Sequence, residues 1–149
     1  MALLANLGLA SSMVALTVLA HFWGLLLLTR VVAGGGAQLR AHESKGKAAL
    51  VILIGVFGVF GLHTAEIWLY AALYSVLGEA NGFEQALYFS TTTFASLGLG
   101  DVVLSPRWRM ISAIEAANGV ILFAWSTTFL MTLTRQLKVL EHDWFERSA

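Results

Sequence analysis

Three long apolar stretches limit this chain to a helical membrane fold. They cover residues 7–32, 48–77 and 110–134. A bilayer core about 30 Å thick needs about 20 apolar residues in one helix, so each stretch is long enough to cross it. The first stretch is too long for a signal-peptide core and has no basic residue before it, so we expect a retained helix. The sequence therefore predicts an all-α membrane protein with three transmembrane helices.

The composition agrees with a bilayer environment and excludes several classes of function. Of the 149 residues, 58% are hydrophobic and 12% are charged, whereas about 25% are charged in a soluble domain. The formal net charge is zero, which gives no basic surface for nucleic acid. Cysteine is absent, so disulfides and thiolate metal sites are excluded. The chain is one domain, and we expect it to build any large pore by oligomerising.

Basic residues predict the orientation in the membrane. Three of them follow the first helix, namely Arg40, Lys45 and Lys47, and two follow the third, namely Arg135 and Lys138. Positive residues mark cytoplasmic segments. We therefore expect a multi-pass protein of the cell membrane with its N-terminus outside and its C-terminus in the cytoplasm. Residues 78–109 then lie at the outer face, and residues 136–149 form a short cytoplasmic tail with a possible surface helix.

Two groups of glycines suggest different roles. Gly34, Gly35 and Gly36 follow the first helix, where we expect them to break it and form a hinge. Gly55, Gly58 and Gly61 lie within the second helix. Their spacing is typical of a smooth face for close helix packing.

The outer segment contains a short apolar stretch that cannot cross a bilayer. Residues 82–95 are apolar enough to enter the membrane, and Asn81 with Glu84 has the spacing of a helix-capping pair. The stretch SLGLGD at residues 96–101 follows. The sequence predicts a re-entrant helix and a returning loop, whose polar backbone groups must be covered by protein or water.

The alternating glycines of this loop suggest a cation-binding backbone. An extended backbone whose carbonyls face one axis needs alternate residues in dihedrals that favour glycine, and Gly98 and Gly100 alternate with Leu97 and Leu99. Four such strands would replace the hydration shell of an ion. We expect the Ser96 hydroxyl to supply the innermost ligands and Asp101 to add negative charge at the outer mouth.

The stretch TTTFASLGLGD resembles the pore helix and filter of the tetrameric potassium channels, and its GLG is similar to one pore loop of the two-pore-domain potassium channels. The resemblance implies a pore domain at residues 48–135, formed by an outer helix, a pore helix, a filter and an inner helix. It implies a homotetramer in the lipid bilayer with K⁺ ions in the filter, and we expect no other cofactor. We see no voltage-sensing arginine ladder in this sequence and expect no soluble ligand domain.

The same resemblance implies roles for other residues. Filter support is expected from Tyr88, Phe89, Thr92, Thr93 and Asp101. Gly119 lies near the hinge glycine of the inner helix, and the pore-facing stripe is expected at Val120, Phe123, Thr127 and Met131. Leucine replaces the filter tyrosine at Leu99, which removes a hydroxyl and predicts a more deformable filter.

Ionisable side chains inside a membrane suggest function. His63 and Glu66 lie one turn apart in the second helix, and Glu115 lies in the outer half of the third. One hypothesis is a proton-sensitive group, with Glu66 or Glu115 bonded to pore-helix threonines behind the filter. The alternative is a hydrogen-bonded pair that holds the pore helix in place. We expect His21 to be a packing or interfacial residue.

The leading functional hypothesis is passive cation conduction by a homotetrameric, potassium-preferring channel that is not an enzyme. An alternative within the same class is a channel with the same filter that conducts sodium and potassium with little preference. A noncatalytic membrane subunit, or a membrane metalloenzyme that uses His63, Glu66 and Glu115, represents a different class of protein.

Overall fold

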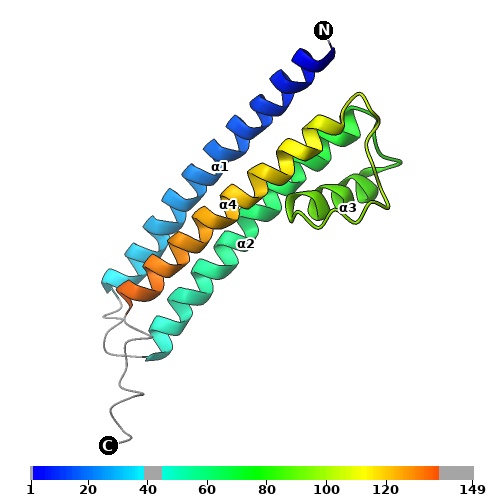
Figure 1. Ribbon diagram of the computed structural model, residues 1–149. Coiled ribbons are helices and arrows are strands. Elements are labelled where there is room, and N and C mark those ends of the chain that lie inside the picture. Colours follow the sequence, from blue (N-terminus) through cyan, green and yellow to red (C-terminus); the bar gives the residue numbers. More distant parts are fainter. Residues whose placement is uncertain (1, 39–44, 138–149) are drawn as a thin grey trace, which may run out of the picture.

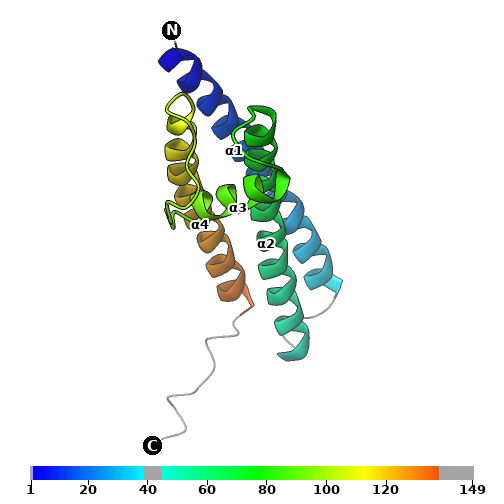
Figure 2. The same cartoon turned by 90° about the vertical axis from the view of Figure 1, so that its right-hand side faces the viewer.

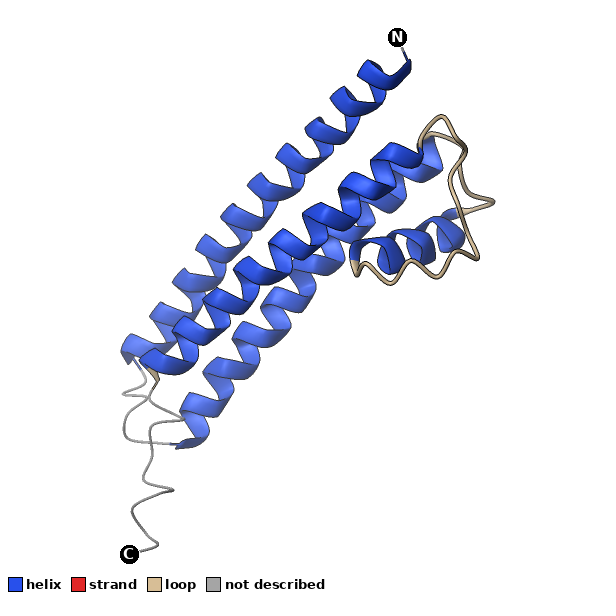
Figure 3. Ribbon diagram, in the orientation of Figure 1, coloured by secondary structure: helices blue, strands red, loops and turns tan. Residues whose placement is uncertain are grey.

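A computed structural model describes residues 2–38 and 45–137 as four helices. They are α1 (Ala2–Gln38), α2 (Lys45–Val76), α3 (Phe83–Phe94) and α4 (Arg109–Gln136) (Figure 1). The described residues form no strand (Figure 3). Three stretches, Leu3–Gly34, Ala48–Val76 and Arg109–Gln136, are long and apolar enough to cross a membrane. The predicted all-α membrane fold with three spans is therefore confirmed.

The three long helices form an elongated bundle, and α3 lies beside it. Helix α3 packs against α2 and α4 near one end of the bundle, as the two perpendicular views show (Figures 1 and 2). The start of α1 and the loops around α3 lie at that end, and the last turn of α4 lies at the other (Figure 1). The tail from residue 138 onward, with its expected surface helix, lies outside the described residues. Residues 39–44, which connect α1 to α2, also lie outside them.

Helices α1 and α2 interlock through two glycines and two leucines. A Cβ atom on Gly24 would lie 2.5 Å from the side chain of Leu62, and one on Gly58 would lie 2.5 Å from the side chain of Leu28. Each helix thus provides one glycine gap and one leucine that fills the gap of its neighbour. Such close approach is typical of small residues at membrane helix interfaces.

The other glycines of the long helices divide into two kinds. A Cβ atom on Gly55 would lie 2.6 Å from Leu133 of α4, whereas one on Gly61 would meet no atom within 4 Å. The predicted packing role is therefore confirmed for Gly55 and Gly58 but not for Gly61. The predicted break at residues 34–36 is wrong, because α1 continues to Gln38. Glycine lowers helix stability by about 1 kcal/mol per residue without forbidding a helix.

The predicted capping pair at the start of α3 is also wrong. The N-cap residue is Gly82, with φ 120°, and no side chain caps the helix. The main-chain N–H of Asn81 donates instead to Oε1 of Gln85, at 2.6 Å. The side chain that reaches back is therefore Gln85. The capping that we expected from Asn81 and Glu84 does not occur.

The best-packed part of the bundle is where α3 meets its neighbours. Tyr70 and Tyr74 of α2, Phe94 of α3 and Ile111 of α4 are fully buried there. Away from this core, large apolar side chains such as Phe57 and Phe60 are 69% and 71% exposed. Exposed apolar surface of this extent needs lipid or protein to cover it.

Candidate functional site

The candidate site begins where α3 ends. The main-chain N–H of Ser96 donates to the carbonyl of Thr93, and that of Leu97 donates to the carbonyl of Thr92, both at 2.8 Å. These two bonds satisfy carbonyls that the last turn of α3 would leave free. They fix the direction in which residues 96–101 leave the helix. Thr92 and Thr93, predicted to support this segment, thus contact it through their main-chain carbonyls.

The backbone after α3 alternates between positive and negative φ. Positive φ occurs at Ser96 (56°), Gly98 (58°) and Gly100 (78°), but not at Leu97 or Leu99. The alternation expected from the glycine spacing is therefore present, and it includes Ser96. Among the described residues other than glycine, Ser96 alone has a positive φ. For such a residue this conformation costs about 1–2 kcal/mol.

One side of this segment is open in a single chain. The side chains of Leu97 and Leu99 are 61% and 60% exposed. A Cβ atom on Gly98 or Gly100 would meet no atom within 4 Å. The backbone between the two leucines is therefore accessible to a ligand or to another chain.

A side-chain hydrogen bond braces the loop from α3. The Tyr88 hydroxyl donates to Oδ2 of Asp101 at 2.7 Å, and this bond raises the pKa of Tyr88. Phe89, from which we also expect support of this loop, packs edge to face against Tyr74, with ring centroids 5.2 Å apart. Phe89 therefore stabilises the contact between α2 and α3.

The Ser96 hydroxyl faces α4. It donates to the carbonyl of Ala116 at 3.3 Å. Ser96 therefore connects the loop to α4, in addition to the ligand role that we expect from the sequence.

Gly119 allows α4 to approach α3 closely. A Cβ atom at this position would lie 2.1 Å from the main-chain oxygen of Phe94. Helix α4 continues through Gly119 without interruption. The residue expected at a hinge is thus also the point of closest packing between the two helices.

The expected pore-facing stripe lies on an exposed side of α4. The side chains of Val120, Phe123, Thr127 and Met131 are all exposed in the single chain. Phe123 also contacts the His63 ring, with centroids 4.6 Å apart.

Glu115 attaches α3 to the bundle from behind. It is fully buried and accepts a hydrogen bond from the hydroxyl of Tyr74. The Ser90 hydroxyl lies 2.6 Å from Oε1 of Glu115 and 2.9 Å from the carbonyl of Ile67. Glu115 therefore binds α3, as one hypothesis expected, but through Ser90 rather than through the threonines of that helix.

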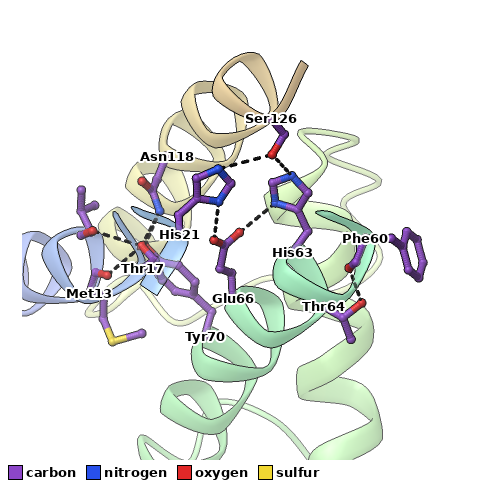
Figure 4. A network of polar contacts seen from close by, with 11 residues as sticks. Met13, Thr17, His21, Phe60, His63, Thr64, Glu66, Tyr70, Asn118 and Ser126 are labelled. Carbon is purple, nitrogen blue, oxygen red and sulfur yellow. Dashed lines mark hydrogen bonds and ion pairs between the residues drawn. The ribbon is translucent and has the colours of Figure 1, made fainter. Parts of the chain in front are cut away.

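Glu66 lies in a separate buried network (Figure 4). His21 Nδ1 is 2.7 Å from Oε1 of Glu66, and His63 Nδ1 is 2.8 Å from Oε2. Both histidines also contact the Ser126 hydroxyl through Nε2, at 3.3 and 3.0 Å. The expected pairing of His63 with Glu66 is confirmed, whereas the expected bond from Glu66 to threonines is wrong.

The same network bears on two further expectations. Of the two roles expected for His21, packing is confirmed and an interfacial position is wrong, because its side chain is fully buried and hydrogen-bonded. The ligand atoms close enough to share a metal ion come from His21, His63 and Glu66, whereas Glu115 binds Tyr74 and Ser90. The set of His63, Glu66 and Glu115 that the metalloenzyme hypothesis requires is therefore not assembled.

Sequence reasoning missed several polar contacts that hold this region together. Asn118 of α4 donates to the hydroxyl of Thr17 on α1 at 2.8 Å. Glu79 accepts from both the main-chain N–H and the hydroxyl of Ser105, at 2.6 and 2.8 Å, and so closes the outer loop. Asn118 is a polar residue within an apolar run, which is the signal that could have identified it.

Comparison with protein families gives a match over the second half of the bundle and beyond. A family model described as "Ion channel" matches residues 51–136, which is more than half of the chain. The matched part contains most of α2, all of α3, the loop after it and all of α4. No curated protein and no solved structure matches the chain.

Proposed function

The chain belongs to an ion channel family, and from this premise we propose that it forms a homotetrameric, potassium-preferring channel. The filter consists of Ser96, Leu97, Gly98, Leu99 and Gly100, and K⁺ ions bind to it during passive conduction. Val120, Phe123, Thr127 and Met131 line the cavity below the filter.

The alternating φ values at Ser96, Gly98 and Gly100 carry this proposal. A turn that only joined two packed helices would not require a repeated alternation, nor would it require a serine in a costly conformation. Rings of carbonyl oxygens can replace the hydration shell of an ion. Tyr88 and Asp101 support the outer end of the segment.

The open side of the filter segment supports the tetramer. Each chain has one such loop, and backbone polar groups at membrane depth must be covered by protein or line a water-filled cavity. Four chains around one axis meet this requirement, because the four segments then enclose the ions. Leu97 and Leu99, which are exposed in the single chain, are then covered by the protein around the filter.

We also assign an orientation in the cell membrane. The start of α1 and the loops around α3 lie at one end of the bundle (Figure 1), and the basic residue Arg135 lies in the last turn of α4, at the other end. Positive residues favour the cytoplasm. The N-terminus and the filter mouth are therefore outside, and the C-terminus is cytoplasmic.

The proposal is tested by cation flux from liposomes that contain the purified protein. Gly98→Ala places a Cβ at φ 58° in the filter, whereas Gly61→Ala adds a methyl group to open space in α2. We expect potassium flux that Gly98→Ala abolishes and Gly61→Ala preserves. Equal effects of the two substitutions would contradict a filter at residues 96–100.

Replacement of potassium by sodium tests the selectivity. The proposal predicts faster potassium flux than sodium flux. Equal rates for the two ions would remove the potassium preference and favour the weakly selective channel, since Leu99 lacks the hydroxyl of the filter tyrosine. A protein that is monomeric in detergent and gives no ion flux after reconstitution into liposomes would favour a noncatalytic membrane subunit.

A further inference from the structure

Four buried side chains from three helices close a ring of hydrogen bonds (Figure 4). Glu66 of α2 contacts Nδ1 of His21 on α1 and Nδ1 of His63 on α2, at 2.7 and 2.8 Å. Ser126 of α4 contacts Nε2 of the same two histidines, at 3.3 and 3.0 Å. Each ring nitrogen, each carboxylate oxygen and the hydroxyl thus has a partner within the ring.

The surroundings of the ring are apolar. All four residues are buried, and aromatic rings from the neighbouring helices pack against the histidines, namely Trp125 and Phe123 of α4 and Phe94 of α3. Water therefore cannot replace a missing bond within the ring at low cost.

Few other ionisable groups face the ring. Helix α1 carries only Arg30 besides His21, and Arg30 is exposed. From α2 the nearest in sequence is Tyr70, whose hydroxyl contacts Asn118. Helix α4 carries Glu115, which Tyr74 and Ser90 bind. The remaining ionisable side chains of the four helices are Lys45, Lys47, Glu84, Tyr88, Arg109 and Arg135.

The number of protons in the ring follows from its geometry. A carboxylate only accepts, so both Nδ1 atoms must carry a proton. The serine hydroxyl donates one bond, so it can satisfy one Nε2 without a proton, and the other Nε2 must donate to the serine oxygen. One histidine is then neutral and the other is an imidazolium. Its positive charge balances Glu66, so the complete ring has no net charge.

We propose that His21, Glu66, His63 and Ser126 form a proton-binding site that attaches α1 to the channel helices. The bound proton has two positions, on Nε2 of His21 or on Nε2 of His63. It moves from one histidine to the other when the Ser126 hydroxyl reverses its direction, and every bond in the ring is kept. Loss of the proton leaves one Nε2 without a hydrogen bond and a net negative charge in an apolar environment.

A metal ion at the same atoms fits the distances less well. Zinc lies about 2.0–2.1 Å from a histidine nitrogen and about 2.0–2.2 Å from a carboxylate oxygen. In a tetrahedral arrangement it would separate the nitrogen and the oxygen by more than about 3 Å. The separations of 2.7 and 2.8 Å are those of direct hydrogen bonds. A divalent ion beside one carboxylate would also leave a buried net charge.

The ring contacts the end of the pore helix, and this step of the inference rests on the proposed function. The His63 ring lies 5.9 Å from the ring of Phe94, the last residue of α3. Ser96 follows two residues later and begins the filter segment. Loss of the proton as the pH rises therefore loosens the packing beneath the filter and changes the rate of conduction.

Nitrogen-15 spectra of the histidine rings test the site without any measure of conduction. The full chain in lipid nanodiscs is labelled at histidine, with His42 and His142 replaced by Asn so that only the ring histidines report. We expect a proton on Nδ1 of both rings and one imidazolium proton that the two Nε2 atoms share by exchange. Nδ1 atoms without protons, or the absence of the imidazolium proton, would overturn the site, and a change of these signals on chelation would identify a metal ion instead.

Glu66→Gln is the matched variant, because its amide can still complete the ring. The amide oxygen accepts from one Nδ1 and the amide N–H donates to the other, so no imidazolium is needed. We expect this variant to fold and to lose the imidazolium signal. Thr64→Val removes a hydroxyl that binds only the carbonyl of Phe60 in its own helix, so its spectra should match those of the parent chain. An imidazolium that persists in Glu66→Gln would overturn the site.

The coupling to conduction has a separate readout. Flux into liposomes is measured from about pH 5 to about pH 9, a range that includes the ordinary histidine titration. We expect flux to depend on pH in the parent chain and in Thr64→Val but not in Glu66→Gln. The same pH profile in all three would overturn the coupling, while the spectra would still decide the proton site. Absence of flux from the parent chain would contradict the proposed channel instead.

Discussion

Gly119 of α4 lies directly against the main-chain carbonyl of Phe94, the last residue of α3, so that a Cβ atom would stand 2.1 Å from the oxygen. The alanine variant must therefore displace the backbone where α3 ends. We expect Gly119→Ala to lower the free energy of unfolding by about 1–3 kcal/mol, as overpacked sites do. Unfolding in mixed micelles, followed by circular dichroism, measures this. Gly61→Ala meets no atom and should stabilise α2, so equal losses in both variants would contradict the close contact.

Glycine is expected to be more stable at position 96 than a residue with a Cβ atom. The φ of 56° at Ser96 costs a residue with a Cβ atom about 1–2 kcal/mol, and the greater freedom of glycine in the unfolded chain returns about 0.4–1 kcal/mol. Ser96→Ala is the matched control, because both variants lose the hydroxyl that binds the carbonyl of Ala116. The free energy of unfolding of Ser96→Gly should exceed that of Ser96→Ala by about 0.5–1 kcal/mol. A glycine variant less stable than the alanine variant would show that this position is not strained.

The bond between Tyr88 and Asp101 predicts a dependence on alkaline pH. Hydrogen bonding to the carboxylate raises the pKa of Tyr88, so the neutral phenol is favoured in the folded chain. The resulting stability is fully present below the ordinary tyrosine value of about 10 and is lost as the pH rises through the higher folded value. In an absorbance titration, Asp101→Asn should move the Tyr88 transition to lower pH. Tyr88→Phe identifies that transition, and an unchanged midpoint in Asp101→Asn would contradict the bond.

Ser90→Ala is expected to weaken the attachment of α3 to the bundle. The variant removes a hydroxyl that contacts the buried carboxylate of Glu115 and the carbonyl of Ile67. A buried acceptor without its partner costs about 1–3 kcal/mol, which should appear as a lower free energy of unfolding. Thr91→Ala is the matched control, since its exposed hydroxyl binds only the carbonyl of Leu87 in the same helix. Similar losses in both variants would contradict a special role for Ser90.

The spans and the alternating backbone of residues 96–100 were predictable from the sequence, because both depend on local chemistry. Apolar runs of sufficient length define the three long helices. The alternation at Gly98 and Gly100 follows from the conformations that glycine favours. Ser96 could not be recognised as strained, because serine itself does not indicate a positive φ.

Contacts between distant residues were not predictable in the same way. The pairing of His63 with Glu66 is local, since the two residues lie one turn apart, but their contact with His21 depends on how α1 packs. The helix through residues 34–36 shows that several glycines do not by themselves end a long helix. The start of α3 depends on which of two neighbouring side chains reaches back, and Gln85 does so instead of Glu84.

The paired glycines and leucines of α1 and α2 also restrict how the two helices can move. Leu28 fills the gap at Gly58, and Leu62 fills the gap at Gly24. If α1 slid by one turn in one direction, the two leucines would collide, and a turn in the other direction would leave the two glycines facing across a void. Helices α1 and α2 therefore resist sliding past one another, and a rearrangement of the bundle requires α4 to move against that pair.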